Sequence, residues 1–410
     1  MEITKKIAII GGGISGLSLL HYLKQRFTSG VEIVLYEANP QLGGAIATVD
    51  NQGFLFETGP NGFLTNQPNT LEFLRETGFD DQLIEADASA IRRYVQMDGG
   101  LHLLPMDPIN FVKTPLLTIK QKLRLLQGLF ITDISKDQSV YDYTSERFGL
   151  AVTDRFVDPF LSGVHAGDIK RLHMKSTFLK LSHRRGKAKL CSFKNGMGSL
   201  IKHLFKKYEA HIRTGMEIKN LSNLKADKIF IATPAYVAAS LVGLEILNQI
   251  YYSPVAVVGL VIKKSSFKKQ PDGFGYLIPS TEGKDVLGVL LESNVFKRNA
   301  QEGMVFVRVM LGGRHHPEII GQQQDQLVAK AIAEIDSIYG LKEGPQGVSF
   351  KLWPKAIPQY ELNYPSIREK VRSFLGGKSD LYLCANYLDG ISFNDCIYNA
   401  KSVVAQLPHL

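Results

Sequence analysis

Near each end of the chain, a short apolar run that predicts a strand is followed by a turn and a predicted helix. Near the start, residues 5–10 (KKIAII) predict a buried strand, a glycine turn follows, and residues 15–25 have helical periodicity. A second strand is predicted over 31–37 (VEIVLYE), which makes the beginning a strand–helix–strand unit. Near the end, a strand is predicted over 381–384 and a helix over 394–406. We therefore expect an α/β domain built from both ends of the chain, with insertions between them.

The middle of the chain changes its pattern twice. Residues 69–78 predict a helix, and Arg92–Leu104 predicts a hairpin with a glycine-containing turn. From Pro105 to about Lys180, glycine is scarce and helical periodicity dominates. Residues 228–233 (KIFIAT) predict one more buried strand, and residues 251–375 alternate strands with turns, as a sheet-rich domain would.

These patterns predict an α/β fold with three parts: a Rossmann-like dinucleotide-binding domain, a sheet-rich substrate domain and a helical insertion. The dinucleotide domain is expected to comprise residues 1–68, 186–240 and 376–410. The substrate domain is expected to comprise residues 69–104 and 241–375, and the helical insertion residues 105–185.

The composition excludes several classes of protein. Of the 410 residues, 44% are hydrophobic and 21% are charged, which excludes disordered and fibrous chains. The net charge of +9 favours an anionic partner, although a basic solvated surface alone gives the same value; we expect no nucleic acid. The three cysteines form no C-x-x-C pair, and no residues have metal-ligand spacing, so we expect neither disulfides nor a metal site. The chain therefore fits a reducing compartment, such as the cytoplasm.

The segment from Phe111 to Phe130 is basic and amphipathic. Its apolar residues recur at helical spacing among four basic ones: Lys113, Lys120, Lys122 and Arg124. A helix that covers a core has this pattern, and so has a helix that lies on a membrane. No run approaches the roughly 20 apolar residues of a membrane-spanning helix. We therefore expect a cytoplasmic protein that associates peripherally with the anionic inner face of the membrane.

The glycine turn after the first strand is the first candidate site. Gly11, Gly13 and Gly16 form G-x-G-x-x-G, which allows a tight turn, a close approach of a pyrophosphate and close helix packing. The N-terminus of the helix then offers N–H groups and its positive dipole end to phosphates. Glu37 lies 21 residues after Gly16, at the end of the second strand, where it can bind ribose hydroxyls. This spacing predicts a dinucleotide site.

The adjacent Gly43 and Gly44 indicate that the bound dinucleotide is FAD and not NAD. Two adjacent glycines, the first six residues after Glu37, give a second close backbone approach, which an extended FAD requires. An ordinary loop with two glycines is the alternative. No cysteine or histidine lies in an attachment motif, so we expect FAD to be bound non-covalently.

Further segments give the chain a resemblance to one family. They are 93–105 (RYVQMDGGLHLLP), 162–168 (SGVHAGD), 193–200 (FKNGMGSL), 273–279 (GFGYLIP), 309–313 (VMLGG), 353–360 (WPKAIPQY) and 386–397 (NYLDGISFNDCI). With the opening IIGGGISGLSLLHYL, their order resembles the oxygen-using, FAD-containing protoporphyrinogen oxidases of the flavin amine oxidase superfamily, over almost the whole chain.

The resemblance implies an activity and its partners. Such an enzyme oxidises a porphyrinogen to a porphyrin in three two-electron steps; in each step the flavin takes a hydride from the macrocycle and a pyrrole N–H is lost. Molecular oxygen is implied as the acceptor, with hydrogen peroxide as its product. We leave open whether the protein is a monomer or a homodimer.

The resemblance also assigns the site residues. Arg93 is implied to bind a substrate propionate, which suits a guanidinium fork, and the Gly163 carbonyl to accept a pyrrole N–H. The apolar wall around the macrocycle is implied to include Ala166, Phe274, Leu277, Leu290 and Met310. A surface arginine and ordinary core residues are the alternatives. The implied cofactor-binding residues are Gly11, Gly13, Ile14, Ser15, Gly16, Glu37, Ala38, Gly43, Gly44, Gly59, Pro60, Asn61, Ile218, Thr233, Trp353, Asn386, Ile391 and Ser392.

Four positions depart from the family pattern. Gln41 and Asn61 stand where arginines are usual, which removes positive charge near the flavin. Ala385 replaces the glycine of a Gly-Asp or Gly-Asn pair that closes the flavin site. His165 stands where an aromatic residue is more usual, and we expect it to be structural.

Four functions remain open at this point. The first is protoporphyrinogen oxidation, and the second is coproporphyrinogen III oxidation, whose four propionates would call for more basic residues at the pocket mouth. The third is another flavin amine oxidase or a desaturase. The fourth is a non-catalytic flavin- or porphyrin-binding protein, which fits the loss of arginine at two positions.

Overall fold

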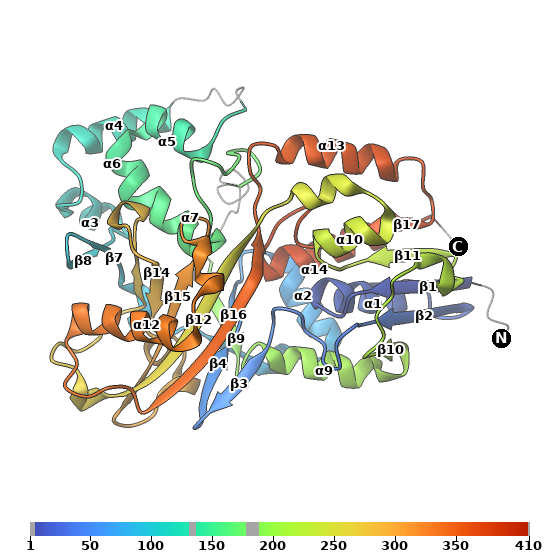
Figure 1. The fold of residues 1–410 in the computed structure, drawn as a ribbon, viewed down its shortest axis with the longest axis horizontal. Helices are drawn as coiled ribbons and strands as arrows, with labels where there is room; N and C mark the ends of the chain where they lie inside the picture. The colour runs from blue at the N-terminus through green and yellow to red at the C-terminus, as the bar shows by residue number, and fades with distance from the viewer. Residues whose placement is uncertain (1–4, 131–136, 178–187, 409–410) are drawn as a thin grey trace.

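A computed structural model describes residues 5–130, 137–177 and 188–408, and one half of the molecule is built on a five-stranded sheet (Figure 1, right). In spatial order its strands are β10 (Ile212–Arg213), β2 (Val31–Tyr36), β1 (Lys5–Ile10), β11 (Lys228–Ile231) and β17 (Leu381–Leu383). Every neighbouring pair is parallel. Strands from the beginning, the middle and the end of the chain therefore share one sheet, which confirms the predicted α/β domain.

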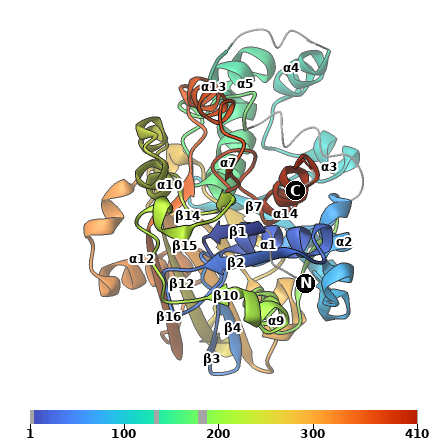
Figure 2. The same cartoon turned by 90° about the vertical axis from the view of Figure 1, so that its right-hand side faces the viewer.

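Helices cover both faces of this sheet. One face packs against α1 (Ile14–Arg26), α2 (Pro68–Thr77), α9 (Gly198–Tyr208) and α14 (Phe393–Ala405), and the other against α10 (Ala235–Val242) and α13 (Tyr364–Leu375). Side chains of each strand alternate between the two faces: Ile9 is buried with the first group of helices and Ile10 with the second. Figure 2 shows α1 and α14 close together beside β1. In such a doubly wound sheet, ligands bind at the carboxyl ends of the strands.

The other half of the molecule contains a seven-stranded sheet (Figure 1, left). In spatial order its strands are β16 (Gly347–Pro358), β12 (Tyr252–Lys263), β15 (Met304–Gly312), β14 (Val286–Leu290), β13 (Gly275–Leu277), β7 (Arg93–Met97) and β8 (Gly100–Leu103). The β13–β7 pair is parallel and the other described pairs are antiparallel. Helix α12 (Gln324–Tyr339) packs on one face, and Phe54 and Phe56 of the hairpin β3 (Thr48–Asn51) and β4 (Phe54–Glu57) are buried on the other.

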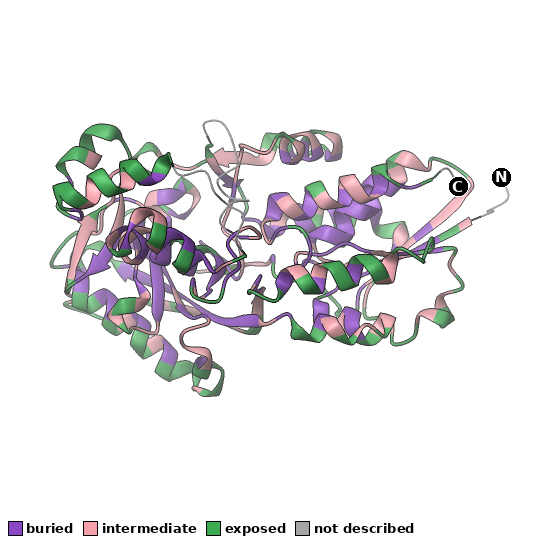
Figure 3. Ribbon diagram, turned by 90° about the horizontal axis from the view of Figure 1, so that it is seen from above, coloured by how far each residue is buried: buried purple, intermediate pink, exposed green. Residues whose placement is uncertain are grey.

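A helical region lies beyond this sheet, at the upper left of Figure 1. Its elements are α3 (Pro108–Lys113), α4 (Ile119–Leu129), α5 (Val140–Phe148), α6 (Leu150–Val152), the π-helical η3 (Thr153–Val157) and α7 (Asp158–His165). The predicted helical insertion is thus present, but the amphipathic segment is two helices. Thr114 and Pro115 separate α3 from α4, and Leu116 and Leu117 are buried between them. Figure 3 shows that the outer faces of the helices at this end are largely exposed.

Smaller elements connect the two halves. A three-stranded sheet has the order β5 (Phe63–Leu64), β9 (Leu190–Phe193), β6 (Leu83–Glu85), and the short helix α11 (Glu292–Val295) follows β14.

Most predicted elements are confirmed within a few residues, but the prediction for 251–375 was wrong in part. That range contains α12 and α13 as well as its strands. The apolar positions Leu327, Ala331 and Ile335 of α12 recur every four residues, a helical spacing that the expectation of strands and turns overlooked. The domain boundaries stay predictions, and the one between 185 and 186 lies outside the described residues.

Candidate active site

The glycine turn after β1 forms an open cradle. Gly11 has a φ of +107°, which favours glycine, and a Cβ there would lie 2.7 Å from the carbonyl oxygen of Ala232. A Cβ on Gly16 would lie 1.9 Å from the carbonyl oxygen of Gly11, so α1 can pack this closely only with glycine. By contrast, a Cβ on Gly13 would meet no described atom within 4 Å. Gly13, as the N-cap of α1, offers no side chain to accept from the first N–H groups of the helix, which leaves them for a ligand.

Gly43 and Gly44 bring a second stretch of backbone against the turn. The N–H of Gly43 donates to the carbonyl of Gly12 at 2.9 Å, and a Cβ on Gly44 would lie 3.7 Å from the Cα of Gly13. The φ of Gly43 is +115°, again a conformation that favours glycine. Two side-chain-free stretches therefore lie side by side, as an extended dinucleotide with a pyrophosphate requires.

Glu37 lies at the end of β2, beside the cradle. Its Oε2 accepts a hydrogen bond from the N–H of Gly12 at 2.7 Å, and its Oε1 accepts from the N–H and the side-chain amide of Asn39, at 2.8 and 2.7 Å. Carboxylate oxygens have further lone pairs, so both can still accept from ribose hydroxyls. The N–H of Met216 donates to the carbonyl of Glu37 at 2.9 Å, which brings the chain before Ile218 to this edge.

The remaining cofactor residues gather where the parallel strands end. Ala38 follows β2, Ile14 and Ser15 begin α1, Thr233 follows β11, and Asn386, Ile391 and Ser392 lie between β17 and α14. Tyr360, which sequence reasoning missed, holds this last loop: its hydroxyl donates to the carbonyl of Asn386 at 2.6 Å and accepts from the N–H of Gly390 at 2.8 Å.

The segment Gly59–Pro60–Asn61 lies between the two halves of the molecule. A Cβ on Gly59 would lie 1.9 Å from the carbonyl oxygen of Ala45, so a side chain cannot be placed there. From β16, the indole N–H of Trp353 donates to the carbonyl of Thr58 at 2.7 Å. Trp353 therefore fixes this cofactor segment to the seven-stranded sheet.

Most of the predicted substrate wall lies on one face of that sheet. The register aligns Arg93 of β7 with Leu290 of β14 through Gly275, and it aligns Leu277 of β13 with Met310 of β15 through Gly288. Residues in register, or two positions along, point to the same face. Through β12, Trp353 belongs to this face as well. Five predicted residues from five strands thus form one surface, which we call the wall face.

Arg93 is a cation without an anionic partner among the described residues. Its Cζ lies 4.7 Å from the centroid of the Phe274 ring, and within the described ranges its side chain forms no ion pair or hydrogen bond. Burial lowers the pKa of Arg93, and in the described part of the chain no carboxylate opposes that shift. Five unused N–H donors beside an apolar wall suit a carboxylate carried by a ligand.

Helix α7 faces the wall with small residues. A Cβ on Gly163 would lie 2.5 Å from Cδ2 of Leu277, so these two predicted residues are neighbours. Ala166 ends α7 in a left-handed conformation, with a φ of +48°, and its carbonyl accepts from the N–H of Arg314 at 2.8 Å. His165 is buried, and its carbonyl accepts from the side-chain amide of Gln359 at 2.8 Å.

A group of four buried charges beside Gly59 was missed by sequence reasoning. Glu57 pairs with Arg298 at 3.0 Å, and Glu292 Oε1 lies 3.9 Å from Arg308 Nη1. Burial raises the pKa of Glu292 to about 7, although both arginines oppose the shift. No local spacing indicates this group, because its members come from β4, α11, η9 (Lys297–Asn299) and β15.

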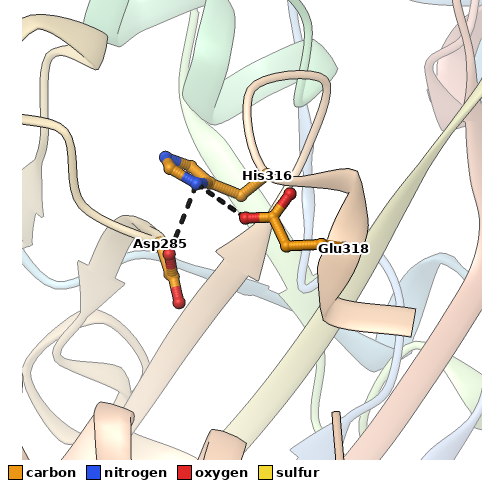
Figure 4. A group of neighbouring side chains, drawn as sticks. All are labelled: Asp285, His316 and Glu318. Atoms are coloured by element: carbon orange, nitrogen blue, oxygen red, sulfur yellow. Dashed lines mark hydrogen bonds and ion pairs between the residues drawn. The ribbon is translucent and has the colours of Figure 1, made fainter. Parts of the chain in front are cut away.

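A second group missed by sequence reasoning is Asp285, His316 and Glu318 (Figure 4). Nδ1 of His316 lies 3.3 Å from Asp285 Oδ1 and 3.1 Å from Glu318 Oε1. These three side chains offer ligand atoms of the kind that bind metals. Lys330 also pairs with Asp285. The carboxylates of the group therefore have cationic partners within the protein, and we assign no metal to it.

Comparisons with known proteins give relatives along the whole chain. The model of the family described as flavin containing amine oxidoreductase matches residues 14–407. The chain is 25% identical over 477 residues to the chloroplastic protoporphyrinogen oxidase of Oryza sativa subsp. japonica, covering 99% of this chain and 88% of that protein. It is 23% identical over 460 residues to the coproporphyrinogen III oxidase of Bacillus subtilis (strain 168), covering 98% and 97%.

Solved structures share the fold. A protein of Exiguobacterium sp. 255-15, named provisionally as a protoporphyrinogen oxidase, superposes with a TM-score of 0.85 at 21% identity, covering 99% of both chains. Cyclohexylamine oxidase from Brevibacterium oxydans IH-35A superposes with a TM-score of 0.72 at 12% identity, covering 98% of both chains. At these identities the likeness shows the architecture alone.

Proposed function

This chain belongs to the flavin containing amine oxidoreductase family and is an FAD-dependent oxidoreductase; we propose that it oxidises protoporphyrinogen IX to protoporphyrin IX with molecular oxygen as acceptor. The cradle at Gly13, the stretch Gly43–Gly44 and the carboxylate of Glu37 fit the pyrophosphate and a ribose of FAD. The observation that carries the substrate proposal is Arg93, a partly buried cation without a described partner, at one end of an apolar wall.

The residues of the wall face would bind and orient the macrocycle. Bound FAD supplies the two-electron oxidation, and three rounds remove the six electrons that separate a porphyrinogen from a porphyrin. Leu277, Leu290 and Met310 would present apolar surface to a flat apolar ring, and Gly163 lets α7 pack closely against Leu277 at the edge of that surface. Arg93 would hold a propionate through charge-assisted hydrogen bonds, which fixes the orientation of the ring.

Oxidation of coproporphyrinogen III is a second candidate, and one cation favours it. Lys351 is in register with Val257, which pairs with Met310, so it belongs to the wall face. Its Nζ lies 4.5 Å from the Trp353 ring. A substrate with four propionates would use a second cation of this kind, and the relative from Bacillus subtilis carries that name.

A side-by-side assay tests both proposals. Purified protein is given each porphyrinogen under air, and porphyrin fluorescence is followed. We expect oxidation of both substrates, with the larger kcat/KM for protoporphyrinogen IX. A larger kcat/KM for coproporphyrinogen III would replace the first proposal with the second, and no oxidation of either would contradict both.

We also propose that α3 and α4 attach the protein peripherally to an anionic membrane surface. A helix that only covers a core buries its apolar side, yet Ile119 and Phe130 are 78% and 85% exposed. The other exposed large apolar residues of this region are Ile109, Val112, Leu123, Leu126 and Leu129. Within the described ranges, no helix is long and apolar enough to span a bilayer. Exposed leucines beside basic residues suit a helix pair that lies on the surface.

Two of the four basic residues of this region also have structural roles. Lys122 donates to the carbonyls of Val112 and Thr114 at 2.7 and 2.9 Å, and Arg124 donates to the carbonyl of Ser145 at 3.3 Å. Charge reversal at either residue would disturb the helices as well as the surface charge. Lys113 and Lys120 are exposed and form no described hydrogen bond, so they are the better residues to change.

Lys113→Glu with Lys120→Glu should weaken sedimentation with anionic vesicles at low salt by at least tenfold in the partition coefficient. Each basic residue near an anionic surface contributes roughly 1 kcal/mol, and reversal also adds repulsion. Lys202→Glu with Lys206→Glu, on α9 at the far side of the molecule, is the matched control and should bind like wild type. If the wild-type protein stays in the supernatant with these vesicles, α3 and α4 do not attach it to an anionic membrane surface.

A further inference from the structure

Two arginines from the seven-stranded half reach the Gly59–Asn61 segment of the cofactor half. Arg308, on the wall face of β15, donates to the carbonyl of Gly59. Arg298 donates to the hydroxyl of Ser192 at 2.6 Å, and that hydroxyl donates to the carbonyl of Asn61 at 2.7 Å. The side chains of Arg308 and Arg298 are only 7% and 5% exposed. Positive charge therefore reaches the predicted flavin segment from across the interface, next to the uncharged Asn61.

The two arginines differ in how well they are neutralised. Arg298 pairs with Glu57 at 3.0 Å, and Glu57 also accepts from the Thr48 hydroxyl at 2.7 Å and the N–H of Met197 at 2.9 Å. The charge of Arg298 is thus closely balanced by a buried carboxylate that accepts several hydrogen bonds. Among the described residues, Arg308 forms one ion pair, with Glu292 at 3.9 Å, and the carboxylate of Glu57 acts on it more weakly.

Although Glu292 is buried, its carboxyl group titrates near neutral pH, because burial disfavours the charged form. It is fully buried, and the two arginines and the Asn299 side chain, which favour its charged form, do not offset the loss of solvation. The charged groups that face it are Arg308 on β15, Arg298 on η9 and Glu57 on β4. Near neutral pH, the Glu292–Arg308 pair therefore passes between a charge-balanced state and a net positive state.

We propose that Arg308 is the positive group that sets the reduction potential of the bound flavin, and that Glu292 is its titratable counter-ion. The proposal rests on FAD lying beside Gly59. Reduction makes the flavin ring electron-rich, so nearby positive charge favours reduction and nearby negative charge opposes it. Both are positioning residues in this proposal, because they act on the potential and exchange no atoms with the substrate.

Glu292→Gln in the FAD-loaded protein tests the proposal, because the amide keeps the shape and removes the charge. The two-electron potential of bound FAD is measured by equilibration with a redox dye at pH 8, above the pKa of Glu292. We expect reduction to become about tenfold more favourable, which is ~30 mV for a two-electron couple. At pH 6 wild-type Glu292 is largely protonated, so the difference should shrink. Adding Arg308→Gln should return the potential at pH 8 to the wild-type value.

Glu334→Gln is the matched control. It removes a buried carboxylate from α12, on the opposite face of the sheet, and should leave the potential unchanged. Should Glu292→Gln lose FAD, Glu292→Gln with Arg308→Lys keeps a positive group and should show the same increase. No increase, or an increase that persists after Arg308→Gln, would overturn the proposal. The potential is measured without porphyrinogen. A protein that binds FAD but oxidises no porphyrinogen would therefore contradict the proposed function, while the potential of its flavin could still be measured.

Discussion

Gly13→Val yields a folded protein that contains no FAD. Gly13 has a φ of −75° and a ψ of −177°, an extended conformation that valine adopts, and its added Cβ would meet no described atom within 4 Å. The fold therefore tolerates the substitution. The same open space is where the pyrophosphate must approach the backbone, so the isopropyl group would exclude it. Flavin absorbance of the purified protein should be lost, while its far-ultraviolet circular dichroism is unchanged.

Gly344→Val is the matched control for this substitution. Gly344 also has open space around it and no positive φ, but it lies before β16, away from the cradle. The variant should keep the FAD content of the wild type. Full FAD content in Gly13→Val would show that the pyrophosphate does not lie at the cradle.

Arg93→Ala raises the KM for protoporphyrinogen about ten- to a hundredfold, and it leaves kcat within about threefold. A lost charge-assisted hydrogen bond costs roughly 1.5–3 kcal/mol, and about 1.4 kcal/mol corresponds to tenfold in affinity. The propionate is remote from the bonds that react, so its contact contributes equally to the ground state and the transition state. Steady-state kinetics under air, followed by porphyrin fluorescence, measure both constants.

Two variants separate the role of Arg93 from that of charge in general. Arg92→Ala removes the neighbouring arginine, which is 55% exposed and pairs with Asp272 at 2.7 Å, and KM should not change. Arg93→Lys keeps the charge but loses the guanidinium fork and its stacking on Phe274, so KM should be intermediate. An unchanged KM in Arg93→Ala, or an equal rise in Arg92→Ala, would remove Arg93 from the substrate site.

The cofactor half of the site could be predicted because its signals are local. The glycine turn, the helix that follows and Glu37 lie within one strand–helix–strand unit, and glycines mark where side chains cannot fit. Arg93, Leu290 and Met310 are far apart in sequence, and resemblance to a family, not spacing, placed them on one site. The register of the seven-stranded sheet supplies the physical reason that they share a face.

The charges beside the flavin segment could not be predicted, because they depend on long-range packing. Arg308 lies within a run of buried valines, a pattern that predicts a core strand and gives no sign of the carbonyl it meets. The pKa of Glu292 reaches about 7 only because the fold buries its carboxyl group. Likewise, the amphipathic pattern of 111–130 did not show which apolar residues are covered: Leu116 is buried, whereas Ile119 is exposed.

Anaerobic titration of the purified yellow protein with protoporphyrinogen IX tests the central proposal most directly. The proposed function predicts that the flavin absorbance is bleached in proportion to the porphyrinogen added, that porphyrin fluorescence appears with it, and that admitting air restores the absorbance. Flavin that stays oxidised in excess porphyrinogen would mean that the protein holds FAD without oxidising this substrate, which contradicts the proposed function.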